Sequence, residues 1–346
     1  HQARFEEEGL LIEESRTNLY ETSEDYGPWN KSATYWSITA NSTTAPDGTN
    51  TATKCIPNAG IVNQSIYNIT TLTSGVTYTG SIFFRAGDLT KVYLRSATQS
   101  NSPGVLVDLT AGTATPTSCT STIQSLPNGW YRVTMTWTQS STAAAGKSGF
   151  GVDSASGETF DGTNGFYSWG AQLEEGSFPT SYIPTSGSTV NRAADVCTIT
   201  GDNFNSWFNQ NEGSLAVDIN VPKQNQGRLI LSILENQTTN INSFQGIGIN
   251  QGSIGGSDYV NRMVWWFGGT RHTSGPVVPY AGKFAQSFEA VGTGALAVNG
   301  SITYNATNLN KNVTLVGLFA NSTFTCKRIS FYPEKLTNEQ LEAITL

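Results

Sequence analysis

Apolar and polar side chains alternate with a period of two in both halves of this chain. At residues 130–137, apolar residues occupy every second position from Tyr131 to Trp137. Because successive side chains of a β-strand lie on opposite faces, this pattern is typical of a strand with one buried face. The pattern recurs at residues 76–84, 214–221 and 328–333. We therefore expect strands to dominate the fold.

The composition favours the same fold class. Only 13% of the residues are charged, and Ser, Thr, Asn and Gly are abundant throughout, a mixture that disfavours helices and suits turns and solvent-facing strands. With 346 residues, the chain is long enough for two ordinary domains. A turn-rich stretch at about residues 184–205 is the expected boundary. We predict an all-β chain of two β-sandwich (jelly-roll) domains, residues 1–190 and 191–346.

Two short elements have specific signals. Asn299-Gly300 is the pair that best tolerates the positive φ angles of a type I′ turn, so it predicts a hairpin. Thr337 and Gln340 are spaced as a capping box and predict one short C-terminal helix at residues 336–344.

Charge and hydropathy exclude some classes of function. The formal net charge is −7 and the pI about 4.9, so the chain lacks the basic stripe of a nucleic-acid-binding protein. It contains no apolar run long enough to predict a membrane span, and it opens on charged residues instead of a signal peptide. The four cysteines, Cys55, Cys119, Cys197 and Cys326, form no CxxC pair that would indicate a zinc or redox site. We expect buried free thiols, with disulfides as the alternative.

Catalytic motifs are also missing. Only His1 and His272 could serve a nucleophilic triad, and no G-x-S-x-G motif accompanies them. Gly146-Lys-Ser148 resembles the end of a phosphate-binding loop, but Ser141 replaces the required glycine, so we interpret it as a turn. Glycoside hydrolysis needs two facing carboxylates, and no strand shows them at alternate positions. A non-enzymatic role is expected, with convergence of carboxylates distant in sequence as the alternative.

Aromatic residues in the second half predict a sugar-binding site, because flat rings stack on the apolar face of a pyranose. Trp265 and Trp266 are adjacent in an expected strand and so face opposite sides of the sheet. One of them must be exposed or lie in an interface. With Arg271, His272 and Tyr280 nearby, they form the predicted ligand site of this half; packing or a subunit contact is the alternative.

The first half offers three further aromatic candidates. Trp29 is expected in the core, which leaves Tyr35, Trp36 and Trp130 for ligand contact. Trp130 falls on the polar side of its strand, as a residue that contacts a ligand would.

Calcium is the candidate structural ion, because it binds oxygen ligands from Asp, Asn and backbone carbonyls. The phrase Asp-Gly-Thr-Asn occurs twice, so Asp47 with Asn50, and Asp161 with Asn164, are the candidate ligands. The alternative for both phrases is a plain turn, which Asp-Gly steps favour. No cofactor is required by any motif.

Several phrases resemble a module of phage tail and prophage structural proteins. They are Gly9-Leu-Leu-Ile-Glu-Glu-Ser-Arg-Thr-Asn-Leu19, Asn128-Gly-Trp-Tyr-Arg-Val133, Trp169-Gly-Ala-Gln-Leu-Glu174, Thr180-Ser-Tyr-Ile-Pro-Thr185 and Arg192-Ala-Ala-Asp195. That module is a jelly roll related to carbohydrate-binding modules. The second half is similar, more weakly, to concanavalin-like and laminin-G-like sandwiches.

The resemblance implies a virion protein of the tail or another surface appendage, extracellular when it works and usually a homotrimer. Its partners would be a host-surface polysaccharide or glycan and other virion proteins, and its role non-catalytic host recognition. A polysaccharide depolymerase (hydrolase or lyase) and a purely structural decoration protein are the alternatives. Arg16 and Arg192, within the shared phrases, are expected to hold the chain together by hydrogen bonds, not to bind ligand.

Overall fold

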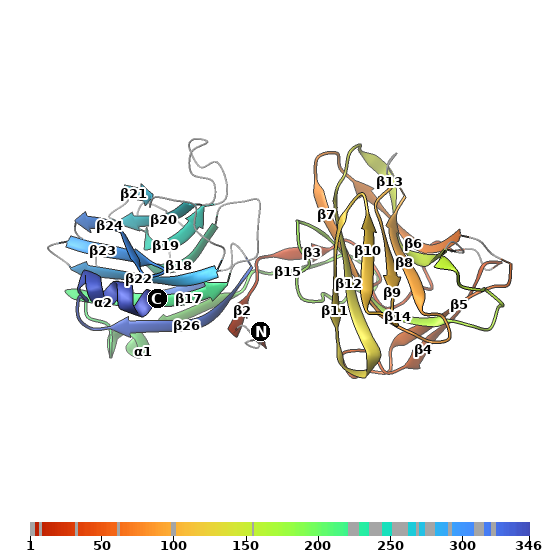
Figure 1. The fold of residues 1–346 in the computed structure, drawn as a ribbon, viewed down its shortest axis with the longest axis horizontal. Helices are drawn as coiled ribbons and strands as arrows, with labels where there is room; N and C mark the ends of the chain where they lie inside the picture. Colours follow the sequence, from red (N-terminus) through yellow and green to blue (C-terminus); the bar gives the residue numbers. More distant parts are fainter. Residues whose placement is uncertain are drawn as a thin grey trace. The chain divides into compact units, whose positions relative to one another are not determined.

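The computed structural model describes residues 4–6, 9–31, 34–60, 63–97, 102–153, 156–220, 228–234, 244–250, 262–267, 270–273, 281–289, 293–307, 315–319 and 323–346. The chain forms two compact units (Figure 1). The first sandwich comprises Arg16–Arg192, and the second comprises His1–Ser15 together with Ala193–Leu346. The boundary after Arg192 lies two residues from the predicted boundary at 190/191. The main difference from the prediction is that residues 1–15 belong to the second sandwich and not to the first.

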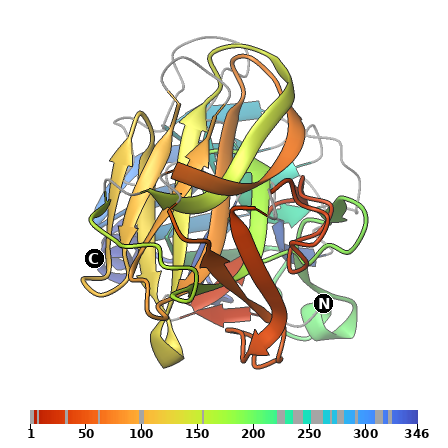
Figure 2. The ribbon, with the colours of Figure 1, turned by 90° about the vertical axis from the view of Figure 1, so that its right-hand side faces the viewer.

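The first sandwich contains two antiparallel sheets (Figure 2). One is five-stranded, in the order β10-β9-β8-β13-β6, and the other six-stranded, β11-β12-β7-β14-β5-β4. The strands are β4 (Trp36–Thr43), β5 (Ala52–Pro57), β6 (Asn63–Leu72), β7 (Thr77–Arg85), β8 (Lys91–Ser96), β9 (Gly104–Asp108), β10 (Thr113–Thr117), β11 (Thr120–Ser125), β12 (Trp130–Thr138), β13 (Ala143–Asp153) and β14 (Phe166–Glu175). A short pair, β3 (Arg16–Asn18) with β15 (Val190–Arg192), joins the two ends of this unit, and a 3-10 turn at Pro127–Gly129 precedes β12.

Aromatic rings fill the space between these sheets. Phe150 of β13 contacts Phe84 and Phe166 of the opposite sheet, with ring centroids 5.8 and 6.2 Å apart. Trp29 packs beside it and is 3% exposed, in the core as the sequence predicts. Burial of each such ring contributes roughly 1.5 to 3 kcal/mol. The cavity beside Trp29 measures about 20 Å³, room for about one water molecule, so a ligand has to bind elsewhere.

The second sandwich also contains two sheets (Figure 1). Their orders are β1-β2-β26-β17-β22-β23-β24 and β16-β25-β18-β19-β20-β21. The strands are β1 (Arg4–Glu6), β2 (Gly9–Ile12), β16 (Val196–Thr200), β17 (Glu212–Asn220), β18 (Arg228–Leu234), β19 (Phe244–Asn250), β20 (Arg262–Phe267), β21 (Thr270–Thr273), β22 (Ala281–Glu289), β23 (Thr293–Val298), β24 (Ser301–Thr307), β25 (Leu315–Phe319) and β26 (Phe324–Tyr332).

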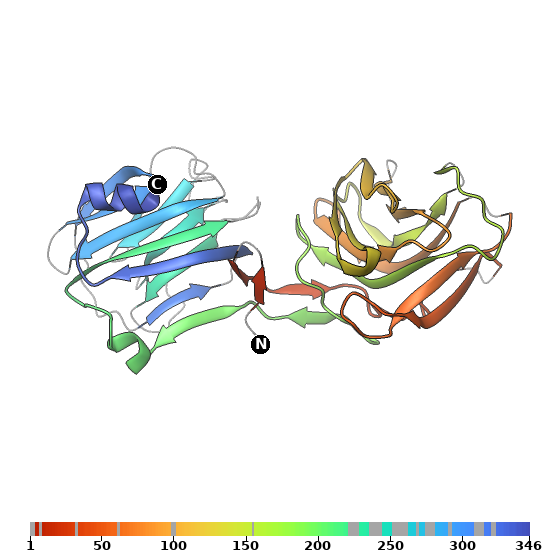
Figure 3. The same cartoon turned by 60° about the horizontal axis from the view of Figure 1, so that its bottom comes forward.

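Both local predictions for this unit are confirmed. Asn299 and Gly300, with φ of 45° and 76°, join β23 to β24. Helix α2 (Asn338–Thr345) begins with the expected capping box: Gln340 N donates to Thr337 Oγ1 at 3.3 Å, and Thr337 N donates to Gln340 Oε1 at 2.8 Å. The helix packs on β22, β23 and β24 and lies across the seven-stranded sheet (Figure 3).

The predicted all-β class, two sandwiches with a short C-terminal helix, is confirmed. One additional helical turn, α1 (Asp202–Asn205), has no clear signal in the sequence. In the part of the chain that the structure describes, no helix is long and apolar enough to cross a membrane.

Candidate functional site

Four of the five predicted ligand residues of the second half lie on one hairpin at the edge of the six-stranded sheet of the second sandwich. Strands β20 and β21 are antiparallel neighbours, with Trp265 opposite His272 and Trp266 opposite Arg271. Tyr280 lies outside the described residues.

Burial removes two of the three aromatic candidates of the first half. Trp36 is 4% exposed and Trp130 is 1% exposed. Trp36 lies in the main core against Phe166, with ring centroids 6.2 Å apart. Neither ring has a free face for a sugar, so the prediction of ligand contact is not supported for these two residues.

Trp130 does lie on the outer face of its sheet, as the alternation predicts, but a second apolar cluster forms there. It packs in a cluster with Phe83 and Trp169, and with two alanines from the connection between β4 and β5 and the start of β5, Ala45 and Ala52. Trp130 Nε1 donates to the carbonyl oxygen of Thr44 at 3.2 Å. The sequence pattern shows which face of the sheet Trp130 occupies, but not that a connection containing Thr44, 86 positions away, folds over that face.

Tyr35 remains exposed, with 38% of its surface accessible. Its carbonyl oxygen accepts a hydrogen bond from Asn58 N at 2.9 Å, and Gly60 N donates to the carbonyl oxygen of Phe160 at 3.3 Å. An ideal Cβ on Gly162 would lie 3.4 Å from Ala59 N. The 58–60 turn therefore connects Tyr35 to the second Asp-Gly-Thr-Asn phrase.

Both Asp-Gly-Thr-Asn phrases form the same turn. Asp47 Oδ1 accepts hydrogen bonds from Thr49 N and Thr49 Oγ1, at 2.9 and 2.7 Å. Asp161 Oδ1 accepts bonds from Thr163 N and Oγ1, at 2.8 and 3.0 Å, and also from Asn164 N at 2.8 Å. The glycines after both aspartates have positive φ, 88° and 84°.

These turns offer few ligands to a metal ion. Asn50 Nδ2 donates to the carbonyl oxygen of Asn41 at 3.2 Å, and one oxygen of each aspartate is already engaged. Within the described ranges, no group of three or more His, Cys, Asp or Glu side chains could hold a metal ion. Calcium usually takes six to eight oxygen ligands, so the arrangement fits the turn interpretation better than a calcium site.

Residues in the phrases that resemble phage modules form hydrogen bonds between distant segments of the first sandwich. Buried Asn18 donates from Nδ2 to the carbonyl oxygens of Ala171 and Ile183, at 3.3 and 2.9 Å. Its Oδ1 accepts from Tyr20 N and Leu173 N, both at 3.1 Å. One side chain thus binds segments more than 150 residues away to its own strand.

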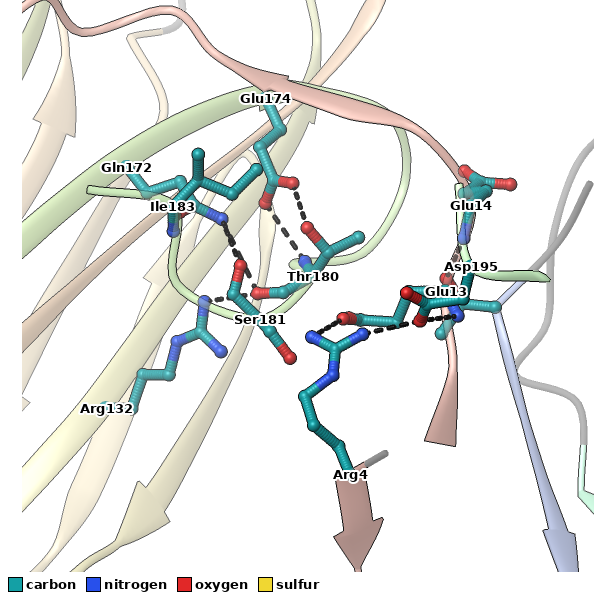
Figure 4. Close-up of polar contacts among 11 residues, drawn as sticks. Arg4, Glu13, Glu14, Arg132, Gln172, Glu174, Thr180, Ser181, Ile183 and Asp195 are labelled. Atoms are coloured by element: carbon teal, nitrogen blue, oxygen red, sulfur yellow. Dashed lines mark hydrogen bonds and ion pairs between the residues drawn. The ribbon is translucent and has the colours of Figure 1, made fainter. Parts of the chain in front are cut away.

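A second set of polar contacts holds the segment after β14 (Figure 4). Both carboxylate oxygens of buried Glu174 accept from Thr180, one from the hydroxyl and one from the amide at 3.0 Å. Arg132 Nη2 donates to the carbonyl oxygen of Thr180 at 2.7 Å, and Ile183 N donates to Gln172 Oε1 at 2.7 Å. These groups satisfy one another and are unavailable to a ligand.

In the second sandwich, an ion-pair clamp holds the N-terminal strands (Figure 4). Arg4 Nη1 lies 2.5 Å from Glu13 Oε2, and Arg4 Nη2 lies 2.6 Å from Asp195 Oδ2. Strand β2 then pairs with β26 at the sheet edge. Although two carboxylates meet here, one guanidinium contacts both, which indicates a structural role and not acid–base chemistry.

The outer face of the five-stranded sheet has the composition of a sugar-binding surface. Tyr67 of β6 lies opposite Gly149 of β13, and Tyr93 of β8 lies opposite Gly151. Both tyrosines are half-buried. An ideal Cβ on Gly104 would lie 2.7 Å from Tyr93 Cε1, so the Tyr93 ring lies over β9.

The two glycines of β13 keep the space between the tyrosines free of side chains. An ideal Cβ would lie 2.2 Å from the carbonyl oxygen of Ile66 at Gly149, and 2.0 Å from that of Gln64 at Gly151. Close approach of β6 therefore requires glycine at both positions. Two strand spacings and two residues separate Tyr67 from Tyr93, roughly 12 Å, further than one pyranose ring reaches.

A cation lies near each tyrosine. Lys147 Nζ is 5.3 Å from the centroid of the Tyr67 ring, and Arg95 Cζ is 5.9 Å from the centroid of the Tyr93 ring. We name this surface, Tyr67, Tyr93, Arg95 and Lys147 with Gly149 and Gly151 between them, the tyrosine face. It combines flat apolar rings with hydrogen-bond donors for hydroxyl groups.

Part of this face has a signal in the sequence. In Lys91-Val-Tyr-Leu-Arg-Ser96, the apolar alternation leaves Tyr93 and Arg95 together on the solvent side. The interpretation of Gly146-Lys-Ser148 as a turn is wrong, since these residues lie inside β13, next to a bulge after Ala143. Glycines that permit close strand packing look like turn residues in the sequence.

No family model and no curated protein matches the chain. Among solved structures it is similar to one of botulinum neurotoxin type C, concerned with its interaction with two ganglioside molecules (TM-score 0.32, 9% identity, 44% of this chain and 39% of that chain). It is also similar to the receptor-binding domain of the botulinum neurotoxin C/D mosaic serotype (TM-score 0.31, 11% identity, 44% of this chain and 40% of that chain). A third similar structure is that of domains LG4–5 of the mouse laminin α1 chain (TM-score 0.25, 9% identity, 92% of this chain and 94% of that chain). The chain spans about two fifths of the neurotoxin chains, and at these TM-scores the likenesses support no functional inference.

Proposed function

We propose that this chain is a non-catalytic glycan-binding protein and that the tyrosine face is its main binding surface. The observation that carries the proposal is the placement of Tyr67 and Tyr93 on one open sheet face, on either side of a glycine-lined strip. The spacing of the rings suits an oligosaccharide that contacts both tyrosines, more than a single sugar.

A sugar ring can replace the cations that lie over the tyrosine rings of this face. A cation–π contact at an exposed site contributes only about 0.5 to 1 kcal/mol. Lys147 is exposed, so a pyranose can replace it on Tyr67 at small cost. The displaced ammonium group, like the Arg95 guanidinium, then donates hydrogen bonds to sugar hydroxyls.

Binding without cleavage fits the acidic residues of the same face. Asp108 Oδ1 accepts hydrogen bonds from Thr110 N and Ala111 N, at 2.9 and 2.8 Å. It is thus held in a turn at the end of β9. Asp153 of β13 would then need another acid to form the carboxylate pair that glycoside hydrolysis uses.

The biological setting that we propose is a phage tail or fibre, in which the chain recognises host-surface glycans outside the cell. This part rests on the sequence phrases shared with phage structural modules, together with the expectation of a homotrimer attached to other virion proteins. Three copies would raise a weak affinity per site by multivalency.

A glycan array with the purified chain tests the proposal. We expect binding of neutral or weakly charged oligosaccharides, with no cleavage products after prolonged incubation. Tyr67→Ala and Tyr93→Ala should each weaken binding by roughly tenfold, whereas Tyr67→Phe and Tyr93→Phe keep the ring and most of the affinity.

Tyr35→Ala is the matched control, because it removes an exposed tyrosine of the same sandwich outside the tyrosine face. Wild-type affinity in folded Tyr67→Ala and Tyr93→Ala proteins would overturn the site. Loss of binding in Tyr35→Ala alone would instead favour the end of the sandwich near the 161–164 turn.

A further inference from the structure

A groove on the second sandwich has no counterpart among the sites predicted from the sequence. This open groove has a volume of about 440 Å³, within the range of ligand pockets. Residues of β17, β22, β26 and α2 line it: Ala216, Val217, Asp218, Lys283, Arg328, Ser330, Tyr332, Ala343 and Ile344. The groove thus lies on the sheet face that α2 partly covers.

Three charged residues stand side by side at one end of this groove. Asp218 is central, with Lys283 opposite it on β22 and Arg328 opposite it on β26. Directly opposed residues of neighbouring strands lie on the same face. All three therefore belong to the groove face, where two cations flank one carboxylate.

These charges do not neutralise one another. Among the described residues, Asp218 forms no ion pair within 4 Å with either cation, and Arg328 Nε donates instead to Ser330 Oγ at 2.9 Å. Lys283 and Arg328 are exposed. A local excess of one positive charge therefore faces the groove, in a chain with a net charge of −7.

The rest of the groove is uncharged. Ala216 and Ser330 are opposed on β17 and β26, and Tyr332 lies two positions further along β26. Ala343 and Ile344 of α2 form the other side. The small side chains of Ala216 and Ser330, beside the ring of Tyr332, leave space for a ring-shaped ligand with polar substituents.

We propose that this groove is a second binding site, for a saccharide residue that carries a carboxylate or sulfate group. The anionic group would bind Lys283 and Arg328 as charge-assisted hydrogen-bond partners. A bare anion would bind the two cations but offer no hydrogen-bond donor to Asp218 between them, so we expect the ligand also to bring hydroxyl groups for that carboxylate. An acidic sugar provides both, and its ring can lie against Tyr332.

The test is an array of acidic saccharides that contain uronate, sialate or sulfated residues, each beside its neutral counterpart, with titration calorimetry of the best pair. We expect the acidic member to bind at least about tenfold more tightly. Lys283→Ala and Arg328→Ala should each remove most of this preference, and rising salt should weaken it. Equal binding of the acidic and neutral members, or no binding of any acidic probe, overturns the proposal.

Lys327→Ala is the matched control, because Lys327 is an exposed cation of the same strand that does not line the groove. Asp218→Asn separates a saccharide from a simple anion: loss of the hydroxyl acceptor should weaken binding of an acidic sugar several-fold. Stronger binding in Asp218→Asn would show that the groove takes an anion without hydroxyl recognition and would overturn the saccharide assignment.

Variants of the tyrosine face distinguish the two proposals. Tyr67→Ala and Tyr93→Ala lie in the other sandwich and should leave the preference for acidic saccharides unchanged. If these variants abolish all binding while Arg328→Ala has no effect, the groove proposal fails and the proposed function stands. The reverse result retains the groove and removes the tyrosine face.

Discussion

Two hydrogen bonds join Glu13 and Asp195 across 182 positions of the sequence, one between their main chains and one from the Glu13 amide to the Asp195 carboxylate. Asp195 N donates to the carbonyl oxygen of Glu13 at 2.8 Å, and Glu13 N donates to Asp195 Oδ2 at 3.0 Å. Arg4 lies between the two carboxylates. The chain therefore returns to its own N-terminus at the start of the second sandwich, and the edge strands β1 and β2 are held there.

Arg4→Ala should destabilise the second sandwich. The Glu13 side chain is 2% exposed, and loss of a cation beside a buried carboxylate costs about 2 to 3 kcal/mol when the other partner is partly solvated. Hydrogen exchange of the β26 amides under native conditions measures this, since the two units need not unfold together.

Lys335→Ala serves as the comparison, because the Lys335–Glu289 pair is 3.0 Å long but its carboxylate side chain is 33% exposed, against 2% for Glu13. Such pairs contribute about 0 to 1 kcal/mol. Equal exchange rates in the Arg4→Ala and wild-type proteins would mean that the clamp is not formed in solution.

Trp130 and Trp36 provide a matched pair of buried tryptophans. Trp130 Nε1 donates to Thr44 O, whereas Trp36 Nε1 is buried and has no hydrogen-bond partner among the described residues. Trp130→Phe should therefore cost about 1 kcal/mol more in unfolding free energy than Trp36→Phe. Urea denaturation of the two variants measures both unfolding free energies. An equal loss of unfolding free energy in the two variants would contradict the hydrogen bond from Trp130. Neither substitution should alter glycan affinity in the folded protein.

Much of the fold could be predicted from the sequence because its signals are local. Period-two alternation gives the strands, Asn299-Gly300 gives a turn with two positive φ angles, and Thr337 with Gln340 caps a helix. Each of these depends on a few neighbouring residues, so distant segments do not change it.

The sites were harder to predict because they depend on segments that are far apart in the sequence and either cover a surface or complete it. The pattern at Trp130 places it on the outer face, but the connection between β4 and β5 buries it. The alternation around Tyr93 indicates its solvent-facing side, but Tyr67 and Tyr93 are brought to one surface only by the register of β6, β13 and β8. Asp218 looks isolated along β17, and its two cations come from positions 283 and 328.

The Asp161 turn should titrate at low pH and ignore calcium. Hydrogen bonds from the amides of Asn164 and Thr163 lower the pKa of the Asp161 carboxyl. Because the folded-state pKa is depressed, the stabilisation is present at neutral pH and is lost as the pH falls through that value. A carboxyl NMR titration should show a midpoint below that of a peptide aspartate, about 3.9.

The same NMR sample tests the alternative for the repeated phrase. Addition of millimolar calcium, or of a chelator, should leave the resonances of the 47–50 and 161–164 turns and the melting temperature unchanged. A calcium-dependent rise in melting temperature would restore Asp47, Asn50, Asp161 and Asn164 as metal ligands.

The four cysteines should differ widely in reactivity. All are free thiols: Cys197 is exposed, Cys119 partly so, and Cys55 and Cys326 are buried. Burial raises the pKa of Cys55 to about 12 and that of Cys326 to about 11, and only the thiolate reacts. A disulfide reagent at pH 8 should therefore modify Cys197 first and Cys55 only after unfolding. Cys197→Ser should remove the fast phase and leave the slower reaction of Cys119; a fast phase that persists when both Cys119 and Cys197 are replaced by serine would contradict the burial of Cys55 and Cys326.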